Sequence, residues 1–273
     1  MESTSSTIAD SRCALCSTVG RLRQSHVIPK FVFDWTKRRG EGLRASNNPN
    51  LQLQDGPKPR MLCGACESRF SGWEREAASK VFRPIHSSNC SELSYGPWFL
   101  KFAVSVSFRV LQYYGDWVRT DPKRAQSVRE RCEFVTKEWA KFLLGRRSLL
   151  GPYEHYCVVL PSSDTDEPSE RTLASFFEGV IDFQPALTTP DDGIAVITKM
   201  CRLCIVGTVQ RGRSKDWVNA RIASKGGLFC PPFAMPTWFV DYLGSRLREA
   251  QHVQQLSPRQ RALLLERALK RGW

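Results

Sequence analysis

The sequence predicts an α+β protein with a cysteine-rich N-terminal unit, a helical middle region and a C-terminal region that mixes helices and strands. Three observations support this class. Two Cys-x-x-Cys pairs lie in the first quarter of the chain, amphipathic stripes of helical period follow, and short apolar runs of strand character come after residue 151. The predicted divisions are a disordered leader at 1–10, a cysteine-paired unit at 11–80, a helical region at 81–150 and an α+β domain at 151–273.

Length and composition bound these predictions. The chain has 273 residues, of which 41% are hydrophobic, enough for one large core or two small ones. No apolar run approaches the roughly 18 residues of a membrane-spanning helix, and the longest, 98–110, is interrupted by Lys101 and Arg109. Because no secretory signal is recognisable either, we expect a cytoplasmic protein without a membrane partner.

Charge is unevenly distributed along the chain. The net charge is +13, and it divides into +5 for residues 1–80, +6 for 81–150, −7 for 151–200 and +9 for 201–273. Basic surfaces attract phosphate backbones because binding releases condensed counterions, and arginine, whose planar fork suits phosphate, dominates here. Solvated basic faces without a ligand are the competing interpretation.

The two Cys-x-x-Cys pairs, Cys13 with Cys16 and Cys63 with Cys66, supply four thiolates, the full tetrahedral set of a structural zinc ion. Two residues between the thiols let a tight turn present both sulfurs to one ion. Forty-six residues separate the pairs, which predicts that the ion closes the base of a large loop. Four unrelated buried cysteines are one alternative, and a disulfide framework, which needs a secretory context, is another.

The order of the motifs is informative. Between the cysteine pairs the chain reads Ser25-His26-Val27-Ile28-Pro29, and Glu67 follows the last cysteine. This order, Cys-x-x-Cys, His-x-x-Pro, Cys-x-x-Cys, resembles the zinc-stapled HNH (His-Me finger) endonucleases over about a quarter of the chain. The resemblance implies a ββα-metal unit in which His26 is the general base and Glu67 holds a catalytic Mg²⁺ or Mn²⁺ ion. It also implies cleavage of nucleic acid, with DNA favoured over RNA as the substrate, and a role in bacterial antiviral defence.

Two positions depart from the pattern of that family. Ser25 stands where the family usually has a metal-binding aspartate, and Glu67 stands where it usually has histidine or asparagine. Glutamate is a good oxygen ligand for magnesium, whereas serine replaces aspartate poorly. Glu74, two helical turns after Glu67, is predicted to lie on the surface or pair with an arginine, with support of the metal as the alternative. The candidates for the family's polarising asparagine are Asn47, Asn48 and Asn50.

In the N-terminal unit, residues 22–28 alternate loosely and predict the strand that carries His26. Residues 30–39 predict a short helix or strand with a buried aromatic face. Contact of this segment with bases and phosphates is the alternative, and the basic residues concerned are Lys37, Arg38 and Arg39. Residues 40–59, rich in Gly, Asn and Pro, predict a long loop or loose hairpin, and a helical period begins at Glu67.

The middle region predicts two amphipathic helices. The first begins near Pro97, with its apolar stripe at 99–110, and the second covers 127–144. In the second, apolar side chains that include Phe134 and Trp139 are expected inside and the basic ones outside. Further on, the expected strands are 156–160, 180–183, 195–198 and 201–209, and a helix is expected over 238–251.

The C-terminal region holds two further candidates. Cys201-Arg202-Leu203-Cys204 repeats the Cys-x-x-Cys pattern, but no second pair follows, so structural cysteines are favoured over a metal site. Arg211, Arg213 and Lys215 form a basic turn, which predicts either a second nucleic-acid surface or a basic hairpin without a ligand. A capped, basic last helix is expected to begin at Ser257.

Two functions from different classes follow for this chain. One is a metal-dependent endonuclease with a structural zinc ion. The other is a catalytically inactive zinc-finger module that binds nucleic acid or protein, which Ser25 in place of aspartate favours. A nuclease that needs an activating protein or ligand is a third hypothesis, in which the acidic segment 151–200 could be the sensing surface.

Overall fold

The computed structural model describes residues 11–38, 43–45, 48–87, 92–120, 126–161, 178–188, 193–213, 217–229, 231–251 and 257–259, together with 262 and 266. The predicted leader and nearly all of the predicted last helix lie outside this part. Within it, α-helices combine with small antiparallel sheets, so the predicted α+β class is confirmed. No helix of the described part is long and apolar enough to cross a bilayer.

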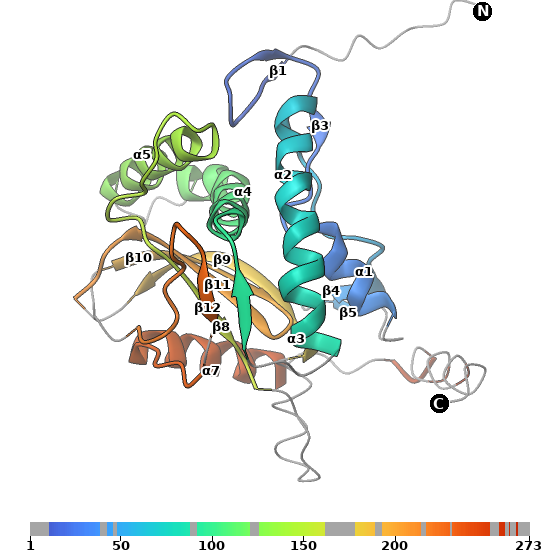
Figure 1. Cartoon of the computed structure of the whole chain (residues 1–273). Helices are drawn as coiled ribbons and strands as arrows, with labels where there is room; N and C mark the ends of the chain where they lie inside the picture. Colours follow the sequence, from blue (N-terminus) through green and yellow to red (C-terminus); the bar gives the residue numbers. More distant parts are fainter. Residues whose placement is uncertain are drawn as a thin grey trace, which may run out of the picture.

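A four-stranded antiparallel sheet is the centre of the C-terminal half (Figure 1). Its strands are β8 (His155–Val159), β9 (Ile181–Thr188), β10 (Gly193–Met200) and β11 (Leu203–Gln210), in the order β8-β11-β10-β9. These four strands include most of each predicted strand. They differ at 201–209, because Cys201 and Arg202 form the turn between β10 and β11 rather than the start of a strand.

Helices cover both faces of this sheet, which explains why β10 is buried along its whole length. Side chains alternate between faces along a strand. Val196 and Ile205 belong to the cluster on the side of α4 (Trp98–Thr120), whereas Ile197 and Val206 pack with α7 (Thr237–Gln251). The helix α5 (Gln126–Leu143) packs beside α4. A separate pair joins β7 (Leu93–Tyr95) to β12 (Gly227–Phe229).

The N-terminal unit is built from short strands and two helices. The strand β1 (Ser11–Arg12) pairs with β2 (Val19–Gly20), and β3 (Arg23–Gln24) pairs with β6 (Arg60–Leu62). Between β3 and β6 lie α1 (Lys30–Arg38) and a hairpin of β4 (Arg44–Ala45) and β5 (Asn48–Gln52). After β6 comes α2 (Gly64–Ala77), which continues through a π-helical stretch, Ala78–Phe82, into α3 (Arg83–Ser87).

The strand expected to carry His26 is shorter than predicted, because β3 ends at Gln24. The backbone amides of Ser25 and Val27 still donate hydrogen bonds across to the carbonyl oxygens of Pro59 and Pro57, at 2.9 and 3.1 Å. Proline has no N–H to return these bonds, so the ladder cannot be completed. The segment therefore stays beside its partner without regular strand geometry, and His26 lies on it.

Burial on α5 also differs from the prediction at one residue. Phe134 is 51% exposed, although its neighbour Val135 is completely buried. Successive residues of a helix point about 100° apart, so the buried face that contains Val135 and Trp139 leaves Phe134 outside it. The buried apolar residues of α4 and α5 join one cluster that extends from Cys13 to Phe229. The predicted domain boundaries stay a prediction.

His155 is a buried titratable group at the start of β8. It is 1% exposed. Its Nδ1–H donates to the carbonyl oxygen of Tyr153 at 3.2 Å, and its Nε2 has no partner among the described residues. Gly207 leaves room for the ring, because a Cβ there would lie 2.7 Å from Nε2. Burial lowers the pKa of His155 to about 3, so the ring is neutral in the folded protein.

We expect this histidine to make the folded state sensitive to acid. The unfolded chain takes up a proton near the ordinary pKa of 6.5, whereas the folded chain does so only near pH 3. The contribution of the neutral ring to stability is therefore complete above pH 6.5 and is lost as the pH falls. Between pH 6 and 4 the free energy of unfolding should decrease more steeply in the wild type than in His155→Gln, by about 1.4 kcal/mol per pH unit. Urea unfolding at constant ionic strength measures both slopes, and equal slopes would contradict the prediction.

Candidate functional site

Four cysteines converge at the N-terminal end of the molecule. Cys13, Cys16, Cys63 and Cys66 have sulfur atoms within 4.8 Å of one another, and they are the only such group of candidate metal ligands in the described part of the chain. None of the four forms a disulfide. The sulfurs of Cys16 and Cys63 lie 3.7 Å apart, and two thiolates of a tetrahedral site with metal–sulfur bonds of about 2.3 Å are separated by roughly 3.8 Å. The cluster could therefore hold a metal ion.

Backbone hydrogen bonds shape the two cysteine turns. The amide of Ser17 donates to the carbonyl oxygen of Cys13 at 2.9 Å, and Ser17 itself has a left-handed φ of 64° that closes the first turn. The amide of Ala14 donates to the carbonyl oxygen of Met61 at 3.0 Å, which joins this turn to β6. The amide of Cys63 donates to the sulfur of Cys13 at 3.3 Å. These bonds bring together two cysteine pairs that are distant in the sequence.

The thiols of the cluster differ in acidity. Burial raises the pKa values of Cys13 and Cys66. The hydrogen bond with the hydroxyl of Thr18, 3.2 Å away, is the main cause that lowers the pKa of Cys16 to about 6. A metal ion binds the thiolate form, so its binding would release protons, among them those of the two buried cysteines.

Glu67 lies in the first turn of α2, where the partial positive charge of the helix N-terminus favours a carboxylate. Its Oε2 accepts a hydrogen bond of 2.8 Å from the hydroxyl of Ser25, which is completely buried. Burial raises the pKa of Glu67, and the nearby charge of Glu74 adds to this, while Ser25 and Arg109 oppose it. The serine at this position therefore forms a hydrogen bond to Glu67, whereas the aspartate that is usual in the family would supply a second carboxylate.

Arg109 of α4 reaches into the same region and is 1% exposed. Its Nη1 lies 2.6 Å from Oε1 of Glu74 and donates to the carbonyl oxygen of His26 at 2.8 Å. Its Nε donates to the carbonyl oxygen of Ser105 at 3.2 Å, and its guanidinium lies over the ring of Phe70. The prediction that Glu74 pairs with an arginine is confirmed. The role of Arg109 was not predicted, because in the sequence it only interrupts an apolar stripe.

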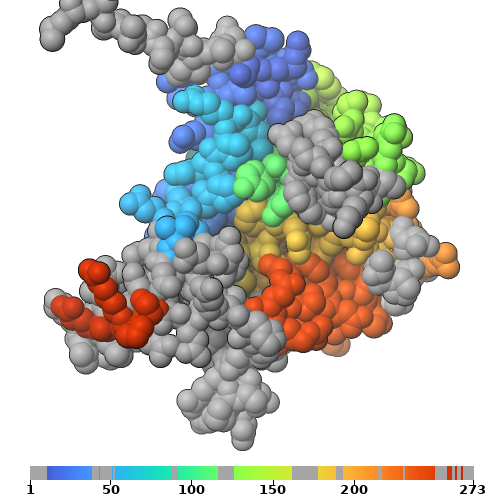
Figure 2. Space-filling model, turned by 180° about the vertical axis from the view of Figure 1, so that it is seen from behind, coloured from blue at the N-terminus to red at the C-terminus, as the bar shows by residue number. Residues whose placement is uncertain are grey.

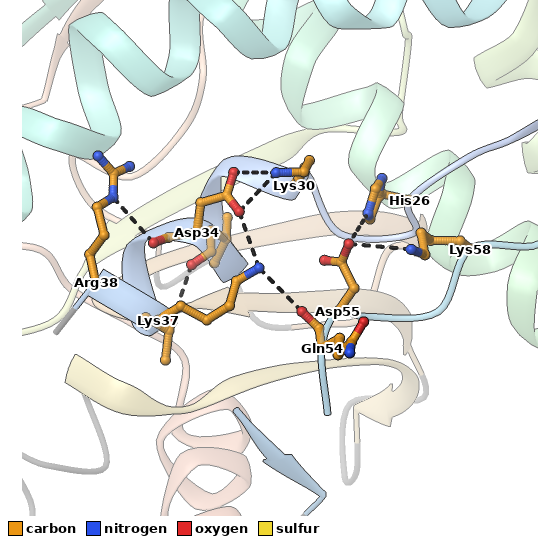
Figure 3. Close-up of polar contacts among 10 residues, drawn as sticks. His26, Lys30, Asp34, Lys37, Arg38, Gln54, Asp55 and Lys58 are labelled. Atoms are coloured by element: carbon orange, nitrogen blue, oxygen red, sulfur yellow. Dashed lines mark hydrogen bonds and ion pairs between the residues drawn. The ribbon is translucent and has the colours of Figure 1, made fainter. Parts of the chain in front are cut away.

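His26 faces a carboxylate that sequence reasoning missed (Figure 3). Its Nε2 lies 3.0 Å from Oδ2 of Asp55, and its side chain is 20% exposed. The same oxygen is 3.3 Å from Nζ of Lys58. Burial opposes ionisation of Asp55, but the bonds from His26 and Lys58 outweigh it and hold the pKa of this carboxyl below its usual value. Gly56 fixes the loop, because a Cβ there would overlap the ring of Phe33.

Asp55 lies in the predicted loop at 40–59, which also holds the three candidate asparagines, but it was not itself predicted as a site residue. Asn47 lies outside the described residues, and of Asn48 and Asn50 only the backbone in β5 is described. The available signal was the polar sequence Gln54-Asp55-Gly56, which lies within the expected loop or hairpin, directly before Pro57.

Of the predicted basic residues of α1, Lys37 reaches toward the segment of Asp55, whereas Arg38 lies farther along the helix (Figure 3). Nζ of Lys37 donates to the carbonyl oxygen of Gln54 and pairs with Asp34, each at 3.2 Å. Nε of Arg38 donates to the carbonyl oxygen of Asp34, also at 3.2 Å. Phe33 is buried, and Phe31 and Trp35 pack partly buried against the same cluster, so the segment is a helix with an aromatic face toward the core, one of the two predicted forms. Arg39 lies outside the described residues.

The second predicted basic surface lies on another side of the molecule. Arg211 and Arg213 are exposed after β11. Arg211 lines a small cavity with Tyr156 and Trp217, which pack on the α7 side of the sheet, whereas the cysteine unit packs on the α4 side. Lys215 lies outside the described residues. The two basic surfaces are therefore separated by the sheet.

The candidate ligands for a catalytic metal ion do not form a second cluster. His26, Glu67 and Glu74 are not brought together as three ligands within the described part of the chain. The third Cys-x-x-Cys also forms no such group: Cys201 and Cys204 are completely buried in two different apolar clusters. This burial agrees with the favoured interpretation of that pair as structural cysteines.

Comparison with known proteins identifies no relative. No protein-family model, no curated protein and no solved structure matches this chain.

Proposed function

We propose that this chain is a metal-dependent HNH-like endonuclease that hydrolyses phosphodiester bonds, with DNA as its substrate. The observation that carries the proposal is the pairing of His26 with Asp55 at 3.0 Å, on a partly exposed surface that also holds Lys37 and Lys58. A histidine held by a carboxylate is a common arrangement for a general base, because the carboxylate fixes the ring and its tautomer.

The proposed chemistry follows from the geometry of this pair. With its proton on Nε2, His26 donates to Asp55, and the lone pair on Nδ1 can accept a proton from the attacking water. Asp55 then stabilises the imidazolium that forms. The lowered pKa of Asp55 keeps its carboxylate ionised at any pH at which a histidine is neutral, so the pair remains charge-assisted.

The two kinds of metal ion have different roles in this proposal. Zinc in the four-cysteine cluster is structural, because four thiolates leave no open coordination position. Glu67 would hold Mg²⁺ or Mn²⁺, which supplies charge stabilisation at the phosphate. One protein carboxylate is a reasonable share of a magnesium site, since this ion usually keeps several waters and binds substrate phosphate. Lys37, Arg38 and Lys58 would contact the phosphate backbone.

Substitution at the pair tests the proposal. We expect His26→Ala to lower the rate of cleavage by about 10²- to 10⁴-fold, the usual contribution of a general base. Asp55→Asn keeps the shape but removes the charge, and it should lower the rate by at least about tenfold. Asp34→Asn is the matched control, because Asp34 is a neighbouring ion-paired carboxylate that has no bond to His26. The measurement is cleavage of plasmid, linear DNA and RNA with Mg²⁺ and then Mn²⁺.

All variants must contain the same amount of zinc, so that a loss of fold is not mistaken for a loss of chemistry. Cleavage that persists in His26→Ala at the wild-type rate would refute the assignment of the base. Cleavage of RNA but not of DNA would refute the proposed substrate while leaving His26 as the base.

A second candidate function has its own structural support. Ser25 already binds Glu67, and Arg109 already pairs with Glu74, so protein groups occupy contacts that a metal ion would use. These contacts favour an inactive zinc module that binds nucleic acid without cutting it. Fluorescence anisotropy separates the two functions: tight binding by the wild type, with no cleavage under any divalent ion, would support the module.

A further inference from the structure

A groove lies between the first cysteine turn and the helices α4 and α5. Its volume is about 570 Å³, within the usual range of ligand sites. Ala14 and Leu15 line it from the cysteine turn and Leu111 lines it from α4, while the opposite side extends from Arg129 of α5 to Leu144 just after that helix. That stretch is about 22 Å long at 1.5 Å per residue. In Figure 2 the blue surface of the cysteine turn lies next to the yellow-green surface of α5. His26, Asp55 and Glu67 do not line this groove.

The groove combines a basic rim with an apolar floor. Glu133 is the one carboxylate among the residues that line it. Four cations line it as well: Arg129, Lys137, Lys141 and Arg146. Lys141 is paired with Glu138 at 2.6 Å, whereas no ion pair joins Lys137 or Arg146 to a described carboxylate. Leu15 and Leu111 are almost fully buried beneath this rim. The surface is therefore amphipathic, with charge outside and apolar side chains below.

We infer that this groove binds a single strand of nucleic acid, with phosphates on the rim cations and bases against the leucine floor. The inference rests on the proposed function and adds to it a second contact surface for the same substrate. Lys137 and Lys141 are one helical turn apart, about 6 Å along the axis, and such a repeat of cations suits a repeating anion. Binding would release counterions from the strand.

The dimensions of the groove select a strand rather than a duplex. A volume of about 570 Å³ takes up a few bases, whereas a duplex is too broad to enter a groove between one turn and one helix. Bases are accessible to an apolar floor only when they are unpaired. The length of the α5 side exceeds what one nucleotide needs, which favours a strand over a free nucleotide.

Fluorescence anisotropy with the full, zinc-loaded chain tests the inference. The probes are a 12-nucleotide DNA of mixed sequence, the same sequence as a duplex, and a free mononucleotide as competitor, all without magnesium or manganese. In the groove variant Lys137→Glu/Arg146→Glu, affinity for the single strand should fall by at least about tenfold. The slope of log K against the logarithm of the salt concentration should also become shallower, by about 0.7 for each lost contact. Ala140→Trp places a large side chain in the groove without changing its charge, and it should also weaken binding of the single strand.

The matched control is Lys225→Glu/Arg248→Glu, which makes the same change of net charge at two exposed positions outside the groove. It should stay within about twofold of the wild type. Equal weakening by both double variants would overturn the inference, because it would indicate a general charge effect. Preference of the wild type for the duplex, or for the free mononucleotide, would overturn it as well.

The outcome is independent of the cleavage assay. The two assays report on different residues, since His26 lies outside the groove. Cleavage by a protein whose groove variants bind normally would refute the groove and retain the nuclease. Groove-dependent binding without any cleavage would retain the groove and refute the nuclease.

Discussion

Removal of the metal ion from the four-cysteine cluster is expected to unfold the N-terminal unit. The first three strands of this unit, β1, β2 and β3, have two residues each, too few to hold one another in place. The cluster joins the turn after β1 to the first turn of α2, and apolar side chains around it belong to the main core. Structural zinc contributes roughly 10–16 kcal/mol of binding free energy in zinc-finger peptides, far more than any single side chain here.

The variant that tests this is Cys66→Ala, which removes one ligand from the first turn of α2. We expect the purified wild type to contain one zinc ion per chain and the variant to contain much less. The variant should lose helical circular dichroism and unfold at lower urea concentration. Cys132→Ala is the matched control, because Cys132 is equally buried but lies on α5 outside the cluster. It should keep its zinc and lose only about 1 kcal/mol of stability.

A chelator gives the same test without mutation. A ligand that binds only the folded unit stabilises it, so the midpoint of unfolding should increase with the concentration of free zinc. A chain that unfolds at the same urea concentration with and without zinc, or that never contains the ion, would show that the four thiols are merely neighbouring cysteines.

The sequence was most informative where local spacing determines the structure. Two residues between cysteines place both sulfurs at one turn, so the cluster could be predicted from the pattern alone. Helical periods over 99–110 and 127–144 likewise predicted α4 and α5. Even there, Phe134 was predicted inside but is exposed. The sequence pattern does not reveal how wide a face of the helix its neighbours cover.

The contacts around His26 depend on residues that are distant in the chain. Asp55 is 29 residues from His26, and Arg109 is 83 residues from it. No local pattern links such residues, because their meeting depends on how α4 packs against α2 and on where the loop before β6 folds. The broken strand at His26 has a similar cause: Pro57 and Pro59 lie on its partner, not on the strand itself.

Replacement of Arg109 by methionine is expected to cost about 3–5 kcal/mol of stability, the usual result of removing one member of a buried ion pair. The variant leaves the Glu74 carboxylate without its cation and the His26 carbonyl without its donor. Methionine retains much of the apolar stem, so the loss reports mainly on charge and hydrogen bonds. Lys101→Met is the matched control, since Lys101 is an exposed cation on the same helix. It should change stability by less than about 1 kcal/mol.

The double variant Arg109→Met/Glu74→Gln decides how much of this loss comes from the unpaired carboxylate. Glu74→Gln removes the charge that Arg109 neutralises, so the double variant should be more stable than Arg109→Met alone, with a coupling of about 0.5–3 kcal/mol. Urea unfolding of zinc-saturated protein gives the four free energies of the cycle. Additive losses would mean that the two side chains are neighbours without a net attraction. A coupled pair would instead mean that the guanidinium of Arg109 neutralises Glu74, which lies near Glu67, while it also holds the backbone of His26, the proposed base. In that case Arg109→Met should slow cleavage without weakening the binding of nucleic acid.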